Sequence, residues 1–145
     1  MYGDTRAIRE LARTMRTEGT ALRAEADALL ARSEAVAWTG LAADAMRASV
    51  HAQTSALRRT ATLADDAAAA LDHHADEVDR LKELIASIER TVMSMVAAAR
   101  DRLAGLVDAV LPDALPDPLD DLLDRFVPPP SGHRDWLLVD LPGLS

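Results

Sequence analysis

His73 and Glu77 are the two side chains whose types and spacing come closest to a chemical site. They stand four residues apart, so on a helix they would lie one turn apart and could share a metal ion. His51 and His133 are distant in sequence, and no third ligand is evident. We therefore interpret the pair as solvated helix surface, and we expect neither a metal site nor a cofactor.

Groupings typical of enzymes are missing from the sequence. It has no Cys, no Gly-x-Ser-x-Gly turn, no Gly-rich phosphate loop and no His-Glu-x-x-His pair. Adjacent carboxylates such as Asp65 and Asp66 fall on predicted helix surface, where carboxylates normally stay solvated. The sequence therefore predicts a protein that is not an enzyme and has no catalytic residues.

The charge pattern of the sequence disfavours binding to nucleic acid and to membranes. The formal net charge is −8, which disfavours binding to polyanions. A basic stripe follows three-four-three spacing: Arg6, Arg9, Arg13 and Arg16. We interpret it as salt-bridged or solvated surface, with a contact to an acidic partner or a regulatory nucleic-acid contact as alternatives. Acidic residues near the C-terminus could pair with it or aid solubility: Asp113, Asp117, Asp120, Asp121 and Asp124. No stretch approaches the roughly 20 apolar residues of a membrane span, so stable membrane insertion is not expected.

The elements that carry these residues are predicted to be helices. Aromatic residues make up only 3% of the chain, and Ala, Leu, Arg and Glu are frequent, a composition that suits helices rather than sheets. One helix is expected over residues 4–36, a turn over 37–40 and a second helix over 41–110. Because the turn is short, the fold class is all-α, an antiparallel hairpin with a long second helix.

Seven-residue periodicity runs along both predicted helices. In the first, small residues recur at this spacing and should let another helix approach closely: Ala12, Gly19, Ala26 and Ser33. In the second, a four-three series passes through Met46, Val50, Gln53, Leu57, Thr60, Ala64, Ala67, Leu71 and His74. We interpret its polar members, Gln53, Thr60 and His74, as residues that set the register of packing.

The two helices are unequal in length. The first can cover the second only to about residues 72–76 at 1.5 Å per residue, yet the second becomes more apolar beyond that point. The predicted partner interface lies there: Val78, Leu81, Ile85, Ile88, Val92 and Met95. Three coverings are possible, namely another protein, a second copy of this chain, or the C-terminal segment folded back.

That C-terminal segment contains all seven prolines of the chain, the first at Pro112. We divide the chain into a helical hairpin over 1–111 and a Pro-rich tail over 112–145. Within the tail a short helix is expected near 119–126, with Asp117 as its cap. The apolar residues 136–139 could dock on the helices, form an edge strand, or stay disordered until bound.

Trp38-Thr39-Gly40, placed between two long helices, is the most specific motif. Together with the opening of the second helix, Leu41-Ala42-Ala43-Asp44-Ala45-Met46, it resembles the WXG100 superfamily of ESAT-6-like type VII secretion proteins, particularly the actinobacterial members. The resemblance covers roughly residues 5–85. It implies a hairpin that dimerises into a four-helix bundle and leaves the cell folded through the type VII machinery. Partners implied are another WXG100-like protein, the helical domain of a toxin, or a second copy.

Departures from that family bear on export. Its Tyr-x-x-x-Asp/Glu signal has no match, because the only Tyr is Tyr2; His73 and Glu77 offer that spacing and are a possible export-signal element. No apolar run follows Met1, so no cleavable signal peptide is expected. We expect a protein that is cytoplasmic before export and then secreted or at the cell surface. The alternative is a cytoplasmic coiled-coil scaffold with no export role.

Overall fold

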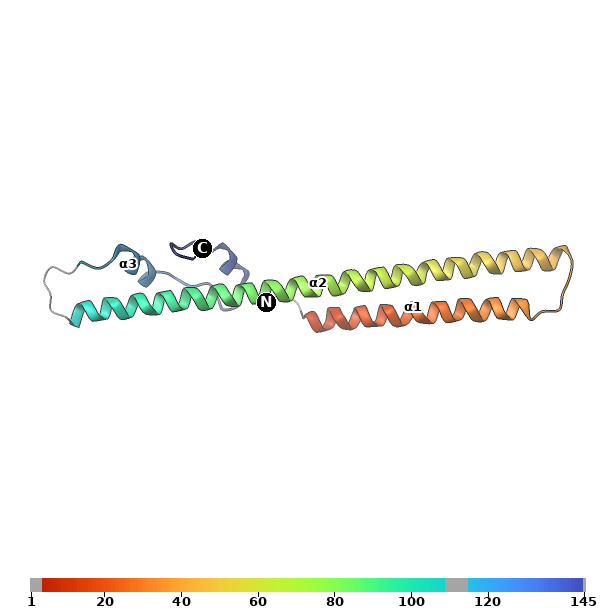
Figure 1. The fold of residues 1–145 in the computed structure, drawn as a ribbon, viewed down its shortest axis with the longest axis horizontal. Coiled ribbons are helices and arrows are strands. Elements are labelled where there is room, and N and C mark those ends of the chain that lie inside the picture. The colour runs from red at the N-terminus through yellow and green to blue at the C-terminus, as the bar shows by residue number, and fades with distance from the viewer. Residues whose placement is uncertain (1–3, 109–114, 145) are drawn as a thin grey trace. The chain divides into compact units, whose positions relative to one another are not determined.

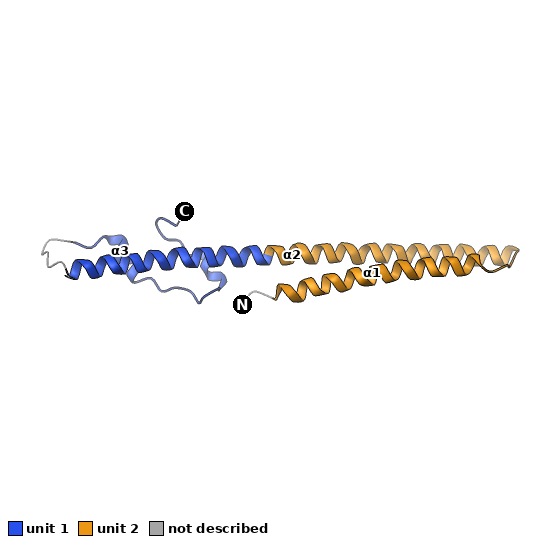
Figure 2. Cartoon of the chain, turned by 60° about the horizontal axis from the view of Figure 1, so that its bottom comes forward, with its two compact units in different colours: residues 1–3, 78–145 blue, residues 4–77 orange. Residues whose placement is uncertain are grey.

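A computed structural model describes residues 4–108 and 115–144 of the chain (Figure 1). Its helices are α1 (Thr5–Glu34), α2 (Leu41–Asp108), α3 (Pro118–Asp124) and the 3-10 helix η1 (Arg134–Leu138). Over these residues there is no strand, so the all-α prediction is confirmed. The chain forms two compact units (Figure 2): unit 2 is Asp4–Glu77, and the described part of unit 1 is 78–108 with 115–144.

Both ends of α1 have clear local causes. The Asp4 carboxylate accepts a hydrogen bond from the Arg6 backbone N–H and so satisfies one of the free donors of the first turn. After Glu34 the chain reverses, and Gly40 adopts a φ of +103°, a conformation that costs glycine little. The Arg47 guanidinium donates to the carbonyls of Val36 and Trp38, at 3.2 and 2.8 Å, and so ties the turn to α2. The predicted helix–turn–helix is therefore confirmed.

Unit 2 is a hairpin in which α1 packs against the first part of α2 through small residues. The buried residues of α1 recur every seventh position: Thr5, Ala12, Gly19, Ala26 and Ser33. Those of α2 between the turn and the end of unit 2 are also small: Ala43, Thr54, Ala61, Ala68 and Ala75. At Gly19 the approach is so close that an added Cβ would lie 3.1 Å from the Ala61 carbonyl oxygen. The small residues therefore let the two helix backbones come close together.

Unit 1 has a conventional core of larger side chains. Ile85, Val92, Val96 and Ala99 of α2 are buried against three residues of the C-terminal segment: Leu123, Trp136 and Leu141. Trp136 is 1% exposed, and its indole N–H donates to the Pro130 carbonyl at 3.0 Å, so its polar atom is satisfied. The Phe126 ring packs beside it at a centroid distance of 6.4 Å. Of the three possibilities for residues 136–139, docking on the helix is the one observed.

The compact units divide the chain differently from the predicted boundary at residues 111 and 112. Unit 2 ends at Glu77, next to the point where the first helix was expected to stop covering the second. The later part of α2 belongs with the C-terminal segment, because its large apolar residues need the cover that this segment supplies. The predicted short helix is present at Pro118–Asp124 with Asp117 as its cap, and α2 is described as far as Asp108. The predicted last residues of that helix, 109 and 110, lie outside the described residues.

Replacing Gly19 by Leu tests the close approach. Leucine is the better helix former, yet its side chain cannot fit beside Ala61, so we expect the free energy of unfolding to fall by about 1–3 kcal/mol. The matched change Gly105→Leu, on a helix position with no atom within 4 Å of an added Cβ, should leave stability unchanged or slightly raised. Urea unfolding followed by circular dichroism measures both, and equal effects would contradict the close packing.

Candidate functional site

The seam of unit 2 separates two sides of the hairpin with opposite chemistry. On a helix, the residues three and four positions after a buried residue lie on opposite sides of it. Four positions after the buried residues stand Arg9, Arg16 and Arg23 in α1, and Arg58, Asp65 and Asp72 in α2. Three positions after them stand apolar residues, in both helices. One side of the hairpin is therefore charged, and the other is apolar.

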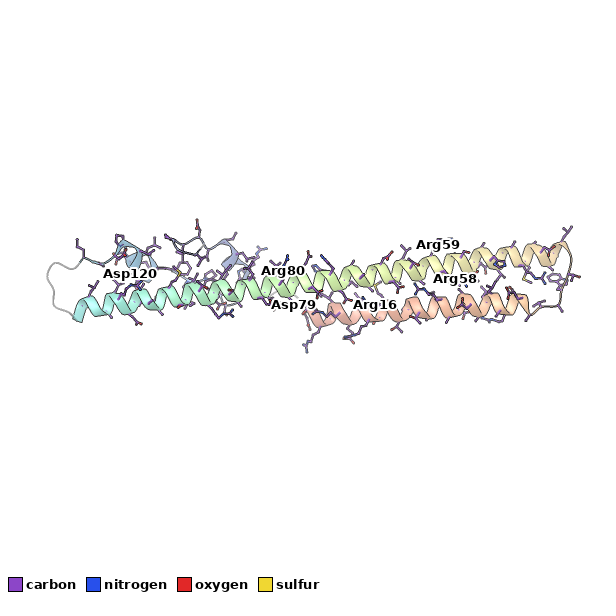
Figure 3. All side chains as sticks on the ribbon, viewed as in Figure 1. Arg16, Arg58, Arg59, Asp79, Arg80 and Asp120 are labelled. Carbon is purple, nitrogen blue, oxygen red and sulfur yellow. The ribbon has the colours of Figure 1, made fainter. Side chains whose placement is uncertain are left out.

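Ion pairs between α1 and α2 bridge the charged side. Their distances are 2.7 Å for Arg9–Asp76, 2.6 Å for Arg16–Asp72, 2.5 Å for Arg23–Asp65 and 2.7 Å for Arg58–Asp27. Two of these arginines, Arg16 on α1 and Arg58 on α2, are labelled in Figure 3. The side chains are partly exposed, so each pair contributes at most about 1 kcal/mol to stability. Arg9 and Arg16 of the predicted basic stripe are thus salt-bridged surface within the chain. These ion pairs also place the charged sides of α1 and α2 on the same side of the hairpin.

The apolar side is only partly covered. Its residues are half-buried along both helices: Ile8, Met15, Leu22 and Leu29 in α1, and Val50, Leu57, Ala64 and Leu71 in α2. We call these eight residues the open apolar side. Next to it on α2, between Met46 and His74, lie two further rows of residues at seven-residue spacing, and neither row contains a charged residue. Leu63, in one of these rows, is 67% exposed. An uncharged face about 30 residues long is the surface a packing helix requires.

The position of Gln53, Thr60 and His74 corrects the predicted series. All three are exposed, so they do not set the register between α1 and α2. The seam instead runs through Thr54, Ala61, Ala68 and Ala75, one residue further along the chain. Alanines are abundant on every face of this helix, so the larger residues beside the seam dominate the seven-residue pattern. The three polar residues lie in the uncharged rows beside the open apolar side.

Apolar side chains also gather at the turn. Trp38 is 50% exposed, and Val36 and Leu41 are 44% and 90% exposed. Trp38 therefore does not lie buried at the end of the hairpin. Gly40 provides the chain reversal, while half of the indole surface remains available for contact.

The predicted chemical pair of His73 and Glu77 stands on the surface of α2. The His73 Nδ1 and Glu77 Oε2 atoms are 3.8 Å apart, and both side chains are exposed. Within residues 4–108 and 115–144, no group of three or more potential ligands could hold a metal ion. The geometry assigns no chemistry to the pair, and its role as an export-signal element stays a prediction.

The predicted partner interface on the later part of α2 needs a correction. Ile85 and Val92 are 1% and 0% exposed because the chain's own C-terminal segment covers them, and Val78 is buried too. Leu81 is half-buried, and Ile88 and Met95 pack against the same cluster. Of the three coverings considered, the C-terminal segment folded back is the one present. In this state Ile85, Ile88, Val92 and Met95 belong to the chain's own core rather than to a free surface.

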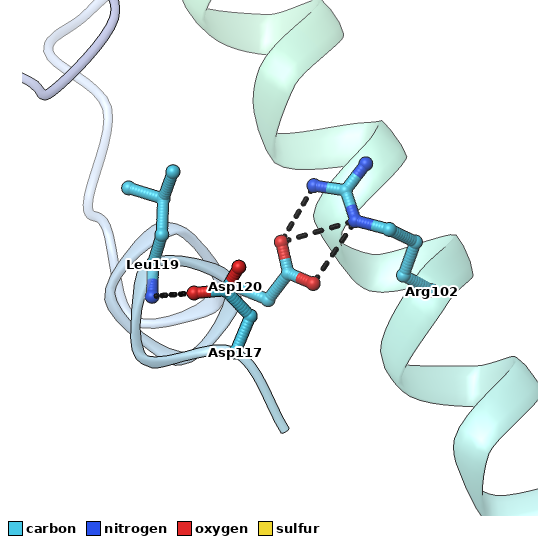
Figure 4. A network of polar contacts seen from close by, with 4 residues as sticks. All are labelled: Arg102, Asp117, Leu119 and Asp120. Atoms are coloured by element: carbon cyan, nitrogen blue, oxygen red, sulfur yellow. Dashed lines mark hydrogen bonds and ion pairs between the residues drawn. The ribbon is translucent and has the colours of Figure 1, made fainter. Parts of the chain in front are cut away.

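Polar contacts hold the C-terminal segment on α2. Arg102 binds the Asp120 carboxylate through two nitrogens, with Nε at 2.9 Å from Oδ2 (Figure 4). Arg100 Nε lies 3.0 Å from Asp124 Oδ1, and the Gly132 backbone N–H donates to Glu89 Oε2 at 3.0 Å. Asp120 and Asp124 of the tail therefore pair with α2 of their own unit. Asp117 caps α3 and Asp121 lies 3.9 Å from Arg125, while Asp113 lies outside the described residues.

Two of these carboxylates titrate below their ordinary values. The hydrogen bonds from Arg102 lower the pKa of Asp120, whose side chain is 6% exposed. Hydrogen bonds from the Ser131 hydroxyl and the Gly132 backbone N–H lower the pKa of Glu89. Both groups are thus bound more strongly when ionised, which links attachment of the segment to pH.

Comparison with known proteins gives no relative: neither a protein-family model, nor a curated protein, nor a solved structure matches the chain. Among the helices that the structure describes, none contains a stretch both long and apolar enough to span a bilayer.

Acid should loosen the C-terminal segment. Because both pKa values are lowered by folding, the contribution of these carboxylates is complete above their ordinary values of 3.8 for Asp120 and 4.5 for Glu89. It is lost as the pH falls below those values. In a Trp38→Phe background, where Trp136 is the remaining tryptophan, we expect a red shift of its emission in this range. Asp120→Asn should show part of that shift at neutral pH; an emission maximum constant throughout the acid titration would contradict the linkage.

Proposed function

We propose that the protein is a non-enzymatic helical adaptor that binds another helical protein through the open apolar side of unit 2. The observation that carries this proposal is the one-sidedness of the hairpin. Ion pairs bridge its charged side, whereas large apolar residues on the other side are only partly covered. A partner helix packed on that side would bury them. The two neighbouring rows of α2 carry no charged side chain, so no charge there would have to be desolvated.

Energetics support the need for such a partner. The seam of unit 2 is built from small side chains, which remove little apolar surface from water. Leu22, Leu57 and Leu71 are already mostly buried. Completing their burial is worth up to about 0.5–1 kcal/mol each, a third of the roughly 1.5–3 kcal/mol that full burial of a leucine contributes. A second hairpin packed on this side would give a four-helix bundle, in which every helix has an apolar stripe facing the centre.

The biological setting that we propose is type VII secretion. Its support is the resemblance to WXG100 proteins, with Trp38 and Gly40 at the turn of a helical hairpin. The partner would then be another WXG100-like protein, the helical domain of a toxin, or a second copy of this chain. The exposed indole of Trp38 is available at the turn for recognition by the export machinery.

Charge placed on the open apolar side tests the interface. Leu57→Glu combined with Leu71→Glu should weaken assembly with the co-expressed partner, or self-assembly, by at least a hundredfold, because two unpaired carboxylates would be desolvated. Arg59→Glu, at an exposed position four residues before Leu63, is the control and should leave assembly unchanged. Native mass spectrometry and sedimentation measure the assemblies. Full assembly of the double variant would refute the interface.

Secretion tests the setting separately. In a cell with a type VII system, we expect the wild-type chain in the culture medium or at the cell surface. Trp38→Ala should be retained inside while keeping its helicity by circular dichroism, since half of that side chain contributes nothing to the fold interior. Retention of the wild-type chain would favour the cytoplasmic scaffold instead.

A further inference from the structure

We propose that Arg47 is a positioning residue for Trp38. Its guanidinium holds the turn between α1 and α2 in one conformation and so presents the half-exposed indole as a preformed contact. This role rests on the proposed recognition of Trp38 during export, and it adds the side chain that gives the indole a fixed place. Arg47 is not among the residues of the open apolar side, so presentation of the turn is separate from assembly through that side.

Arg47 stands where the seam of α2 runs past the end of α1. It precedes the buried Thr54 by seven residues, the spacing at which the alanines of the seam follow. The ion pair between Asp27 and Arg58 places those two residues at the same level of the hairpin. From there α1 continues for seven residues to Glu34, whereas Arg47 lies eleven residues away on α2, about one helical turn further. A long side chain therefore fits at this seam position, and its head group can reach the turn.

One guanidinium nitrogen binds two carbonyl groups of the turn. Arg47 Nη2 donates to the Trp38 carbonyl at 2.8 Å and to the Val36 carbonyl at 3.2 Å, while Nη1 lies 3.6 Å from Asp44 Oδ1. The Arg47 side chain is 31% exposed, so water competes only in part for these contacts. Because the N–H donors of a guanidinium lie in one plane with fixed directions, a single side chain joins the turn to the first turn of α2.

The turn has few other contacts that could fix the indole. Residues 36–39 belong to no helix, and the backbone hydrogen bond described within them joins the Trp38 N–H to the Val36 carbonyl at 2.9 Å. Trp38 is 50% exposed, whereas Trp136 is 1% exposed. Without the guanidinium the indole should therefore move more freely. A side chain that is already held in its bound position loses less conformational entropy when a partner binds it, so Arg47 should favour recognition of Trp38.

Arg47→Met tests the positioning in the full-length chain, with Arg59→Met, at an exposed position of α2, as the matched control. The two indole N–H groups report separately on Trp38 and on Trp136, which serves as an internal control. We expect the heteronuclear NOE of the Trp38 indole N–H to fall at least twofold in Arg47→Met and to keep its wild-type value in Arg59→Met. The Trp136 signal should stay unchanged in both variants.

Export should follow the order of the indole. Arg47→Lys keeps the positive charge but lacks the planar set of donors, so its Trp38 NOE should lie between those of the wild type and Arg47→Met. In a cell with a type VII system, secretion should fall in the same sequence, at least fivefold for Arg47→Met. Helicity by circular dichroism and assembly by native mass spectrometry should match those of Arg59→Met, because neither depends on the turn carbonyls.

Three results would overturn the proposal. The first is a Trp38 indole as ordered in Arg47→Met as in Arg59→Met. The second is undiminished secretion of Arg47→Met although its indole is mobile. The third is loss of helicity in both Arg47 variants, which would make Arg47 part of the fold rather than a positioning residue. Retention of the wild-type chain would refute the proposed export setting instead, and the NOE comparison would still decide whether Arg47 positions Trp38.

Discussion

Close contact between two helix backbones through small residues is the constraint on which unit 2 depends. Gly19 lies against the Ala61 carbonyl so closely that a side chain there would force the helices apart. Small seam residues place α1 and α2 near enough for arginine–aspartate pairs to bridge one side. Because the seam residues are small, they bury less apolar surface than the larger residues of an ordinary helical hairpin. The large apolar residues are consequently on the flank of the seam, half-covered, where a partner helix can complete their burial.

In unit 1 the apolar surface of α2 is covered by a different part of the chain. The buried residues of its part of α2 include isoleucine and valine, whereas those of α2 in unit 2 are alanine and threonine, so it offers more apolar area than a single helix can leave in water. The chain covers this area with its own C-terminal segment, using Trp136 as the largest buried side chain. The prolines of that segment keep its helices short, and the resulting irregular cover is held by carboxylates that respond to acid.

Periodicity and turn chemistry made most of the fold predictable, and the candidate site less so. Asp4, Gly40 and Asp117 act through local backbone geometry, which sequence reports directly. The seam of α2 was placed one residue away because alanine gives no contrast between buried and exposed positions. The covering of Ile85 and Val92 could not be chosen among three possibilities, since sequence says that an apolar face must be covered but not by what. The sequence alone did not show that the charged sides of α1 and α2 lie together on one side of the hairpin; the ion pairs between the two helices show it.

Methionine oxidation compared between intact producing cells and the dilute purified chain tests the central claim most directly. Met15 lies on the open apolar side and Met46 borders it, whereas Met93 is 42% exposed in unit 1. If a helical partner packs on the open apolar side, Met15 and Met46 will be oxidised at least several-fold more slowly in cells than in the dilute chain, relative to Met93 in the same sample. Equal protection of all three, or no protection of Met15 and Met46, would contradict the account.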